Sequence, residues 1–433
     1  MPVFLNATDP DFETAFQALL SAKREDSPDV DATVAGIIAD VRQRGDAALI
    51  ELTAKFDRLT LTPDRLRISE AEIKDALAAV PAEELEALKT AADRIRAYHL
   101  RQRPEDAEWT DETGATLGWR WSAVSAAGLY VPGGLASYPS SVLMNAVPAK
   151  VAGVPRLAMV VPAPDGVLNP LVLAAANLAG VDEVYRVGGA QAIAALAYGT
   201  ETIAPVDKIT GPGNAFVAAA KRRVFGKVGI DMIAGPSEIL VVADADNDPD
   251  WIALDLLSQA EHDESAQSVL ITTDAAFGQA VADAVTARLE TLERRAIAGV
   301  SWRDFGAIIT VPDLVVAAAL TDRIAPEHLE LCVADPEALS ANITHAGAIF
   351  LGQWTPEAIG DYVGGPNHVL PTARSARFSS GLSVLDFMKR TTLARMTPAA
   401  LRTIGPAAET LAKTESLQAH GLSVTARLRK LNE

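Results

Sequence analysis

Six histidines and a single cysteine limit the chemistry that this 433-residue chain can perform. An imidazole close in sequence to a carboxylate or an amide can serve as a general base or as a metal ligand. Three segments offer that combination, namely LSQAEHDESAQ from Leu257, APEHLEL from Ala325 and IGDYVGGPNHVLPT from Ile359. Because Cys332 is alone, the sequence excludes a disulfide within the chain and a cysteine-ligated zinc or iron–sulfur centre. Any metal ligands must therefore be nitrogen or oxygen atoms.

The first segment places Gln259 and His262 three residues apart near the end of a helical pattern. Side chains at this spacing project from the same helix face, so the two could form half of a metal site. Glu261 would be the better ligand by chemistry, and a solvated polar helix end is the simpler interpretation of the whole segment. From the spacing alone we favour that simpler interpretation.

The second segment holds Glu327 directly beside His328, and neighbours of this kind could act together only from a loop or a first helical turn. An acid and an imidazole could supply two separate proton transfers, although a capped short helix with a surface histidine explains the segment equally well. In the third segment Asp361 and His368 flank a Gly-Gly-Pro loop, where the carboxylate is either a ligand or a turn residue. His420, close to the C-terminus, has a surface histidine as its simplest interpretation.

Two glycine turns lie between a predicted strand and a predicted helix, GGAQ at 188–191 and GPGN at 211–214. Glycine lets the backbone approach a ligand closely, and a helix N-terminus offers unpaired N–H groups to an anion. Neither turn matches the G-x-G-x-x-G pattern, and a need to turn the chain explains the glycines equally well. Together they indicate a nucleotide only weakly.

Short apolar strands alternate with helices of ten to fifteen residues through much of the chain, which is typical of parallel βαβ units. The pattern is helical from Phe12 to about Leu100, with Ser69 and Glu72 as a capping box, and is β-friendly from Ala115 to Val131. The last fifty residues or so are again helical. The predicted strands begin at residues 157, 183, 207, 238, 267, 306 and 347.

We therefore predict an α/β protein with two incomplete Rossmann-like parallel-sheet domains and helical extensions at both ends. Residues 1–25 would form an N-terminal extension, and 26–128 with 236–380 a first, discontinuous domain. Residues 129–235 would form the second domain, and 381–433 a C-terminal helical dimerisation arm. No long linker separates these blocks, so their boundaries are soft.

The charge balance of 38 Lys+Arg against 56 Asp+Glu, a net charge of −18, disfavours nucleic acid and anionic membranes as partners. It would suit a small cationic substrate. The N-terminus lacks the basic and apolar regions of a secretory signal, and no run of ~18 apolar residues occurs. We expect a cytoplasmic protein.

Long segments of the chain resemble the histidinol dehydrogenase family and occur in the same order as in that family. The resemblance spans about residues 12–428. It implies oxidation of L-histidinol to L-histidine in two steps through an aldehyde, with two NAD and one zinc ion per subunit of a homodimer. The segments are GLYVPGG, VGGAQAIAALAYGTE, VDKITGPGNAFVAAAKR, AGPSEILVVAD, LLSQAEHDESAQ, APEHLEL, AGAIFLG and GDYVGGPNHVLPT.

The resemblance also assigns roles to individual residues. It makes His328 the base that takes the hydroxyl proton and Glu327 the group that activates water. It implies four zinc ligands, of which the last comes from the other subunit: Gln259, His262, Asp361 and His420. These ligands also contact the substrate, together with Ser237, His328 and Glu415, the last of which we expect across the subunit interface. The NAD contacts, which place the cofactor on the domain at 129–235, are Tyr130, Gln191 and Asn214.

Three alternatives stay open. A paralogue could keep the fold, zinc and NAD but oxidise another small diol, such as a sulfonated propanediol. The acids near Ser237, His328 and Glu415 favour a cationic substrate over that anionic one. A zinc hydrolase would need no nucleotide, and a non-catalytic metal-binding protein would leave Glu327 and His328 without a task.

Overall fold

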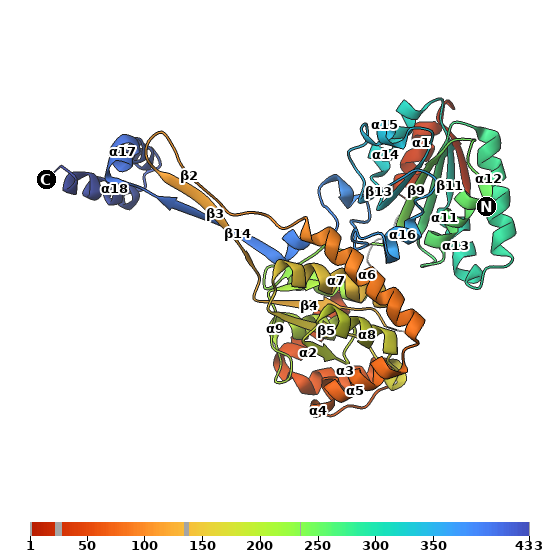
Figure 1. Ribbon diagram of the computed structural model, residues 1–433, viewed down its shortest axis with the longest axis horizontal. Helices are drawn as coiled ribbons and strands as arrows, with labels where there is room; N and C mark the ends of the chain where they lie inside the picture. Colours follow the sequence, from red (N-terminus) through yellow and green to blue (C-terminus); the bar gives the residue numbers. More distant parts are fainter. Residues whose placement is uncertain (1, 22–27, 134–137, 234, 433) are drawn as a thin grey trace.

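The computed structural model describes residues 2–21, 28–133, 138–233 and 235–432. These residues form two lobes and an arm that projects from them (Figure 1). The N-terminus lies in one lobe, and the C-terminus lies at the far end of the arm. The described strands form one parallel sheet in each lobe and an antiparallel sheet in the arm.

The first lobe is built on a five-stranded parallel sheet in the order β6-β5-β4-β7-β8. Its first strand, β4, lies in the middle, so the chain adds strands on one side of β4 and then on the other. This is the doubly wound arrangement that the alternating pattern predicts. The strands are β4 (Ala126–Tyr130), β5 (Arg156–Val160), β6 (Glu183–Tyr185), β7 (Lys208–Thr210) and β8 (Gly229–Ile230).

Helices cover both faces of this sheet and divide its core into two apolar clusters. The helices α7 (Pro139–Ala152) and α8 (Pro170–Ala179) pack in the cluster on one face. The helices α9 (Gly189–Tyr198) and α10 (Ala215–Val224) pack in the cluster on the other face. The change of face follows the point at which the strand order reverses, between β4 and β7.

The second lobe repeats this topology around β9 in a six-stranded parallel sheet, in the order β1-β11-β10-β9-β12-β13. Its strand order reverses between β9 and β12. The strands are β1 (Val3–Asn6), β9 (Glu238–Ala243), β10 (Gln267–Thr272), β11 (Ala307–Thr310), β12 (His328–Cys332) and β13 (Ala348–Leu351). The helices are α1 (Phe12–Ser21), α11 (Pro249–Ala260), α12 (Ala275–Leu289), α13 (Arg295–Phe305), α14 (Leu314–Ile324), α15 (Pro336–Ser340) and α16 (Glu357–Tyr362).

The N-terminal helices pack on the first lobe, which corrects the predicted grouping of residues 26–128 with 236–380. Helix α2 contacts α9 and α10, α5 contacts α8, and α6 contacts α7. The physical reason is burial, because Val34 and Val41 of α2 and Leu49 of α3 lie in the same apolar cluster as α9. These helices are α2 (Pro28–Arg44), α3 (Asp46–Asp57), α4 (Pro63–Leu66), α5 (Glu70–Ala79) and α6 (Ala82–Leu100).

The predicted N-terminal extension is not separate from the second lobe either. Strand β1, which the sequence analysis did not predict, pairs in parallel with β11, and Phe12 and Phe16 of α1 are buried in the same core. Pairing at a sheet edge depends on a neighbour some three hundred residues away in sequence. Local periodicity therefore carries no signal for it.

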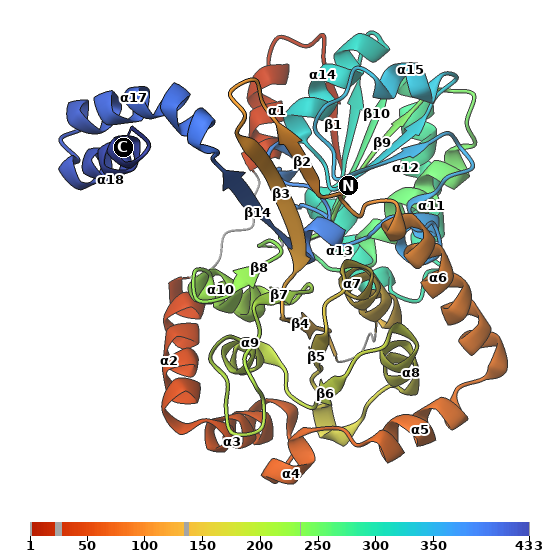
Figure 2. The same ribbon diagram turned by 60° about the vertical axis from the view of Figure 1, so that its left-hand side comes forward.

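The arm is an antiparallel sheet that continues into a pair of packed helices (Figure 2). Strand β14 (Met388–Arg395) pairs antiparallel with β3 (Thr116–Ala123), which also pairs with β2 (Ala107–Thr110). Helices α17 (Pro398–Thr414) and α18 (Gln418–Lys430) pack against each other beyond the strands. The prediction of helices at the C-terminus is confirmed, whereas β14 was not predicted.

The predicted fold class is confirmed, and one local prediction is wrong. The capping box of Ser69 and Glu72 opens α5 as predicted. The segment that holds His328, interpreted as a short helix or loop, is instead the strand β12, of which all five residues are buried. Its polar–apolar alternation is typical of a half-buried strand, but the neighbouring proline and the two acids favoured a turn. Among the described residues, no helix is long and apolar enough to cross a membrane.

Candidate functional site

The predicted acid, the predicted base and the substrate contact predicted at Ser237 meet at the amino edge of the six-stranded sheet. Ser237 precedes β9, and Glu327 precedes β12, which begins with His328. Strands β9 and β12 are parallel neighbours with His328 opposite Ile239, so the residues before both strands lie at one edge. Tertiary pairing therefore brings together residues ninety positions apart.

Two helices also end at this edge, namely α11, which connects β9 to β10 and runs antiparallel to them, and α16, which follows β13. Helix α11 ends next to Gln259 and His262, and α16 carries Asp361 close to its end. The two helices contact each other. Gln259 is 1% exposed, whereas His262 is exposed at the surface of this chain.

His328 is a buried imidazole with a defined tautomer. Its Nδ1 lies 3.1 Å from the carbonyl oxygen of Glu238, which can only accept a hydrogen bond. The hydrogen is therefore on Nδ1, and the lone pair of Nε2 is available. Among the described residues, Nε2 has no hydrogen-bond partner, and Asp361 Oδ1 is 4.0 Å away. Burial lowers the pKa of His328 to about 4, against the opposing effect of Asp361, so the ring is neutral at pH 7.

Several carboxylates surround this imidazole. Glu327 Oε2 accepts the backbone N–H of Glu238 at 2.9 Å and lies 3.7 Å from His328 Nδ1. Glu357, the first residue of α16, lies closer, with Oε1 3.2 Å from His328 Nδ1. Burial and then the charge of Asp361 raise the pKa of Glu357 well above its usual value. Three acids around one imidazole would repel one another, so protons or a cation must neutralise part of this charge.

The donor set is suited to a metal ion. His328, Glu357 and Asp361 each offer a ligand atom, and these atoms lie within 4.8 Å of one another. The Gln259 Oε1 atom is buried and, within the described ranges, has no hydrogen-bond partner. An orphaned amide oxygen is costly unless something binds it. Nitrogen and oxygen ligands of this kind suit zinc, so the residues present are compatible with the predicted ion.

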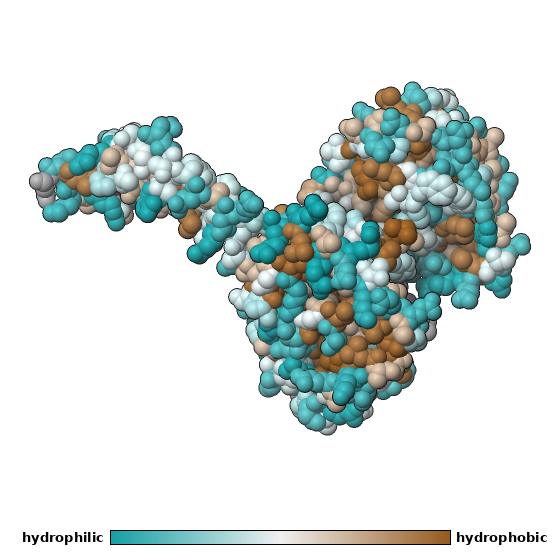
Figure 3. Space-filling view, in the orientation of Figure 1, coloured by the Kyte–Doolittle hydropathy of each residue, from teal (hydrophilic) through white to brown (hydrophobic). Residues whose placement is uncertain are grey.

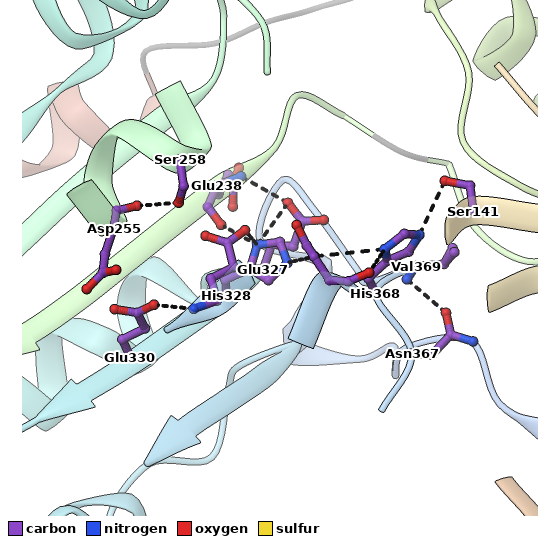
Figure 4. A network of polar contacts seen from close by, with 12 residues as sticks. Ser141, Glu238, Asp255, Ser258, Glu327, His328, Glu330, Asn367, His368 and Val369 are labelled. Atoms are coloured by element: carbon purple, nitrogen blue, oxygen red, sulfur yellow. Dashed lines mark hydrogen bonds and ion pairs between the residues drawn. The ribbon is translucent and has the colours of Figure 1, made fainter. Parts of the chain in front are cut away.

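His368 joins the site from the loop after α16. Its Nδ1 lies 3.0 Å from the carbonyl oxygen of Asp361 and 3.9 Å from Asp361 Oδ1. Its Nε2 lies 3.3 Å from Ser141 Oγ, in the first turn of α7. Figure 4 shows His368 between Ser141 on one side and the group of Glu327 and His328 on the other. Because α7 follows β4, the site lies where the two lobes meet.

Glu357 and His368 are the residues that the sequence analysis missed. His368 was noted beside Asp361 but received no role, and Glu357 was not considered. The segment that holds both Asp361 and His368 offered a signal, because polar residues on a glycine-rich loop often mark sites. Glu357 offered none, since only the packing of α16 against β12 places it beside His328.

A second layer of acids lies behind the imidazole. Glu330, two residues along β12, accepts the backbone N–H of Glu357 at 2.6 Å through Oε1. Its carboxyl group neighbours that of Asp255 on α11, and after burial the charge of Asp255 helps to raise the pKa of Glu330 well above its usual value. Burial raises the pKa of Asp255 to about 6.

The chain does not bring its own His420 and Glu415 to this site. Glu415 ends α17 and His420 lies on α18, both at the far end of the arm (Figure 1). Both side chains are exposed. The remaining predicted ligands, Gln259, His262 and Asp361, lie at the edge described above.

The predicted NAD contacts cluster at the carboxyl edge of the five-stranded sheet. Tyr130 ends β4 and is buried, and its hydroxyl accepts the backbone N–H of Gly189 at 3.1 Å. Burial raises the pKa of Tyr130 to about 12, which keeps the hydroxyl protonated. Gln191 follows in the first turn of α9 and is 2% exposed. One hydrogen bond therefore connects the end of β4 to the first glycine turn.

The second glycine turn lies beside the first. Asn214 caps α10, with Oδ1 accepting the N–H groups of Phe216 at 3.1 Å and Val217 at 3.2 Å. The turn starts after β7, the strand next to β4 on the side where the order reverses. In doubly wound sheets, ligands bind outside the carboxyl ends of the strands at this reversal. The topology alone thus marks the position of Tyr130 and Asn214 as a ligand site.

Comparison with known proteins identifies the family. The family model for histidinol dehydrogenase matches residues 20–428. The chain belongs to the histidinol dehydrogenase family. A curated histidinol dehydrogenase of Ruegeria pomeroyi is 81% identical over 432 residues, and that of Cereibacter sphaeroides is 77% identical over 433 residues. Both alignments cover 100% of each chain.

A solved structure supports the same assignment. The crystal structure of histidinol dehydrogenase from Elizabethkingia anophelis superposes with a TM-score of 0.95 at 37% identity. It covers 100% of this chain and 99% of that chain. The predicted membership of the histidinol dehydrogenase family, and with it an NAD-dependent oxidoreductase, is confirmed.

Proposed function

We propose that this chain oxidises L-histidinol to L-histidine in two successive steps through an aldehyde, with reduction of two NAD and with one bound zinc ion per subunit. The observation that carries the proposal is the state of His328. Its Nδ1 is held by a carbonyl oxygen, and its Nε2 is unpaired among the described groups and lies at the edge where Gln259 and Asp361 meet. A neutral, oriented imidazole in such a place is suited to accept a proton.

In the first oxidation, His328 Nε2 takes the proton from the substrate hydroxyl. The bound NAD supplies the chemistry of a hydride acceptor at the carbinol carbon. The hydrogen bond from Nδ1 to the Glu238 carbonyl keeps the ring in the tautomer with a free Nε2 lone pair. The lowered pKa of His328 keeps this lone pair unprotonated at neutral pH, but it also makes the imidazole a weaker base.

In the second oxidation, Glu327 takes a proton from water as the water oxygen adds to the aldehyde carbon. Loss of hydride from the resulting hydrate anion to a second NAD would give the carboxylic acid, which releases its proton to solvent and leaves as the carboxylate. Glu327 is fixed by the backbone N–H of Glu238, next to the strand that begins with His328. The two neighbouring residues therefore hold their proton-transferring groups in one site and can serve different steps.

The zinc ligands in this proposal are Gln259, His262, Asp361 and His420 of a second subunit. The orphaned Gln259 Oε1 atom and the position of Asp361 support the first and third of these. When bound by these residues, zinc would supply a Lewis acid to a substrate that carries nitrogen donors. The excess of carboxylates around His328 favours a cationic amino alcohol over an anionic diol.

The arm supports a homodimer in which subunits share their sites. His420 and Glu415 lie far from the site of their own chain, on an arm that projects into solvent (Figure 1). The arm shows small apolar patches on a mainly hydrophilic face (Figure 3). Large apolar side chains that are exposed on the arm favour its burial against a partner subunit. These side chains, each at least 37% exposed, are Leu393, Met396, Ile404, Leu411, Leu417 and Leu422.

A steady-state assay with L-histidinol, NAD and zinc tests this function. We expect about two NADH per L-histidinol oxidised, because the aldehyde stays bound between steps. Turnover of another diol, such as a sulfonated propanediol, without turnover of L-histidinol would show that the chain is a paralogue. A zinc-dependent hydrolysis that needs no NAD would contradict the dehydrogenase mechanism altogether.

A further inference from the structure

Lys221 and Asp231 form a buried ion pair in the lobe of the predicted NAD contacts. Lys221 Nζ, on α10, pairs with Asp231 Oδ1, which follows β8, and their side chains are 3% and 1% exposed. A buried ion pair adds little net stability, because the loss of hydration offsets the attraction of the charges. The neighbours of this pair indicate a different purpose.

Both members of the pair hydrogen-bond the backbone of Gly211. Lys221 Nζ donates to the Gly211 carbonyl oxygen at 3.0 Å, and the Gly211 N–H donates to Asp231 Oδ2 at 2.8 Å. Both backbone polar groups of one glycine are thus bound by buried charges. Hydrogen bonds to charged groups are roughly twice as strong as neutral ones, so the position of Gly211 is tightly defined.

Gly211 lies directly against the end of β4. Its φ is +114°, and a Cβ atom there would lie 2.1 Å from the carbonyl oxygen of Tyr130. The turn that starts at Gly211 ends at Asn214, the cap of α10. A shift of Gly211 would therefore move Asn214 and disturb the backbone of Tyr130, two of the predicted NAD contacts.

We propose that Lys221 and Asp231 are positioning residues that hold the turn at 211–214 in the conformation that binds NAD. The inference rests on the proposed function, in which Asn214 contacts NAD. Both side chains are buried beneath the turn, so they act through Gly211 and do not touch the cofactor. The Tyr130 hydroxyl extends the effect to Gly189 and the other glycine turn.

The decisive variant replaces both charges at once, Lys221→Met with Asp231→Leu, because an apolar pair leaves no unpaired charge in the core. We expect the dissociation constant for NAD, measured by titration calorimetry on the zinc-loaded protein, to rise about tenfold or more, since misplaced binding groups lose affinity steeply. The KM for L-histidinol should change less than about twofold, because the substrate site is in the other lobe.

Two control variants define the comparison. Arg156→Met removes the ion pair with Glu183, whose Arg156 Nη2 and Glu183 Oε2 atoms are 3.3 Å apart at the amino edge of the same sheet. It should leave the NAD dissociation constant unchanged, because that edge is opposite the glycine turns. Asn214→Ala should itself weaken NAD binding.

The outcomes separate this inference from the function on which it rests. A folded double variant with the wild-type NAD dissociation constant overturns the inference if Asn214→Ala weakens binding. Unchanged NAD binding in Asn214→Ala contradicts the proposed NAD contacts instead, and absence of NAD binding in the wild type contradicts the proposed function.

A single variant decides the case in which the double variant does not fold. Asp231→Asn keeps an oxygen that can accept the Gly211 N–H but removes the charge that pairs with Lys221. A rise in the NAD dissociation constant with an unchanged KM for L-histidinol supports the positioning role. A similar rise in both the NAD dissociation constant and the KM for L-histidinol, or no change in either, overturns the positioning role.

Discussion

Ser141 Oγ lies 3.3 Å from His368 Nε2, and this contact joins the two lobes at the candidate site. Ser141 belongs to the helix that follows β4, the strand with the predicted NAD contact Tyr130. His368 belongs to the loop that follows Asp361. The carboxyl edge of one sheet thereby faces the amino edge of the other, so the predicted NAD contacts of the first lobe and the proposed base of the second lobe lie on facing edges.

Ser141→Ala should weaken this junction without removing any group that transfers a proton. We expect a loss of about fivefold in kcat/KM for L-histidinol, in keeping with about 1 kcal/mol for one neutral hydrogen bond. The NAD dissociation constant should stay at the wild-type value. The control is Ser140→Ala, a change at the neighbouring residue of α7. Asn145→Ala is unsuitable because the Asn145 amide donates a hydrogen bond to the Ser141 carbonyl oxygen. Equal activity of Ser141→Ala and wild type would show that the contact has no role in catalysis.

His328→Asn should remove oxidation while leaving the fold intact. We expect kcat to fall about 10²–10⁴-fold, the usual contribution of a general base. The asparagine amide can still donate to the Glu238 carbonyl, so zinc content and the dimer should be unchanged. Metal analysis and light scattering on the same preparation check this. Loss of the dimer would mean that His328 is a structural residue rather than a base.

His420→Ala should lose zinc and activity if the arm completes the site of another subunit. In a mixed dimer the His420→Ala subunit keeps its own His262 and the His262→Ala subunit supplies His420, so such a dimer should contain one intact site. Mixing under conditions that exchange subunits should therefore restore some activity. The two variants mixed without exchange provide the baseline, and no recovery after exchange would count against a shared site.

Asp255→Asn should change how stability depends on pH. Burial raises the pKa of Asp255 to about 6, above its ordinary value, so the folded chain holds this proton more tightly than the unfolded chain. That contribution is fully present below about pH 4 and is lost as the pH rises through about 6. The wild type should therefore lose on the order of 2 kcal/mol relative to Asp255→Asn across this interval.

Urea unfolding at a series of pH values and one protein concentration measures this difference. Asp283→Asn, a change at an exposed aspartate of α12, is the matched control and should run parallel to the wild type. Parallel curves for Asp255→Asn and wild type would show that the carboxyl pair with Glu330 does not hold an extra proton in the fold.

Sequence patterns predicted the local elements because helix and strand periodicity depends on near neighbours. The capping box at Ser69, the strand and helix alternation and the glycine turns are all present, whereas the strands β1 and β14 were not predicted and the strand at His328 was misassigned. The alternation of polar and apolar residues in this strand is too short to outweigh the turn signal of the neighbouring acids and proline. The lone cysteine already restricted metal ligands to nitrogen and oxygen.

Tertiary structure alone decided which residues share a site. Glu357 lies beside His328 only because α16 packs against β12, and α2 joins the first lobe because its apolar face is buried against α9. The same packing separates His420 from the other predicted ligands of its own chain, Gln259, His262 and Asp361. Local sequence determined the types of chemical groups and the elements that carry them. Burial of apolar faces between distant segments determined their distances, because that energy depends on contacts that no local pattern records.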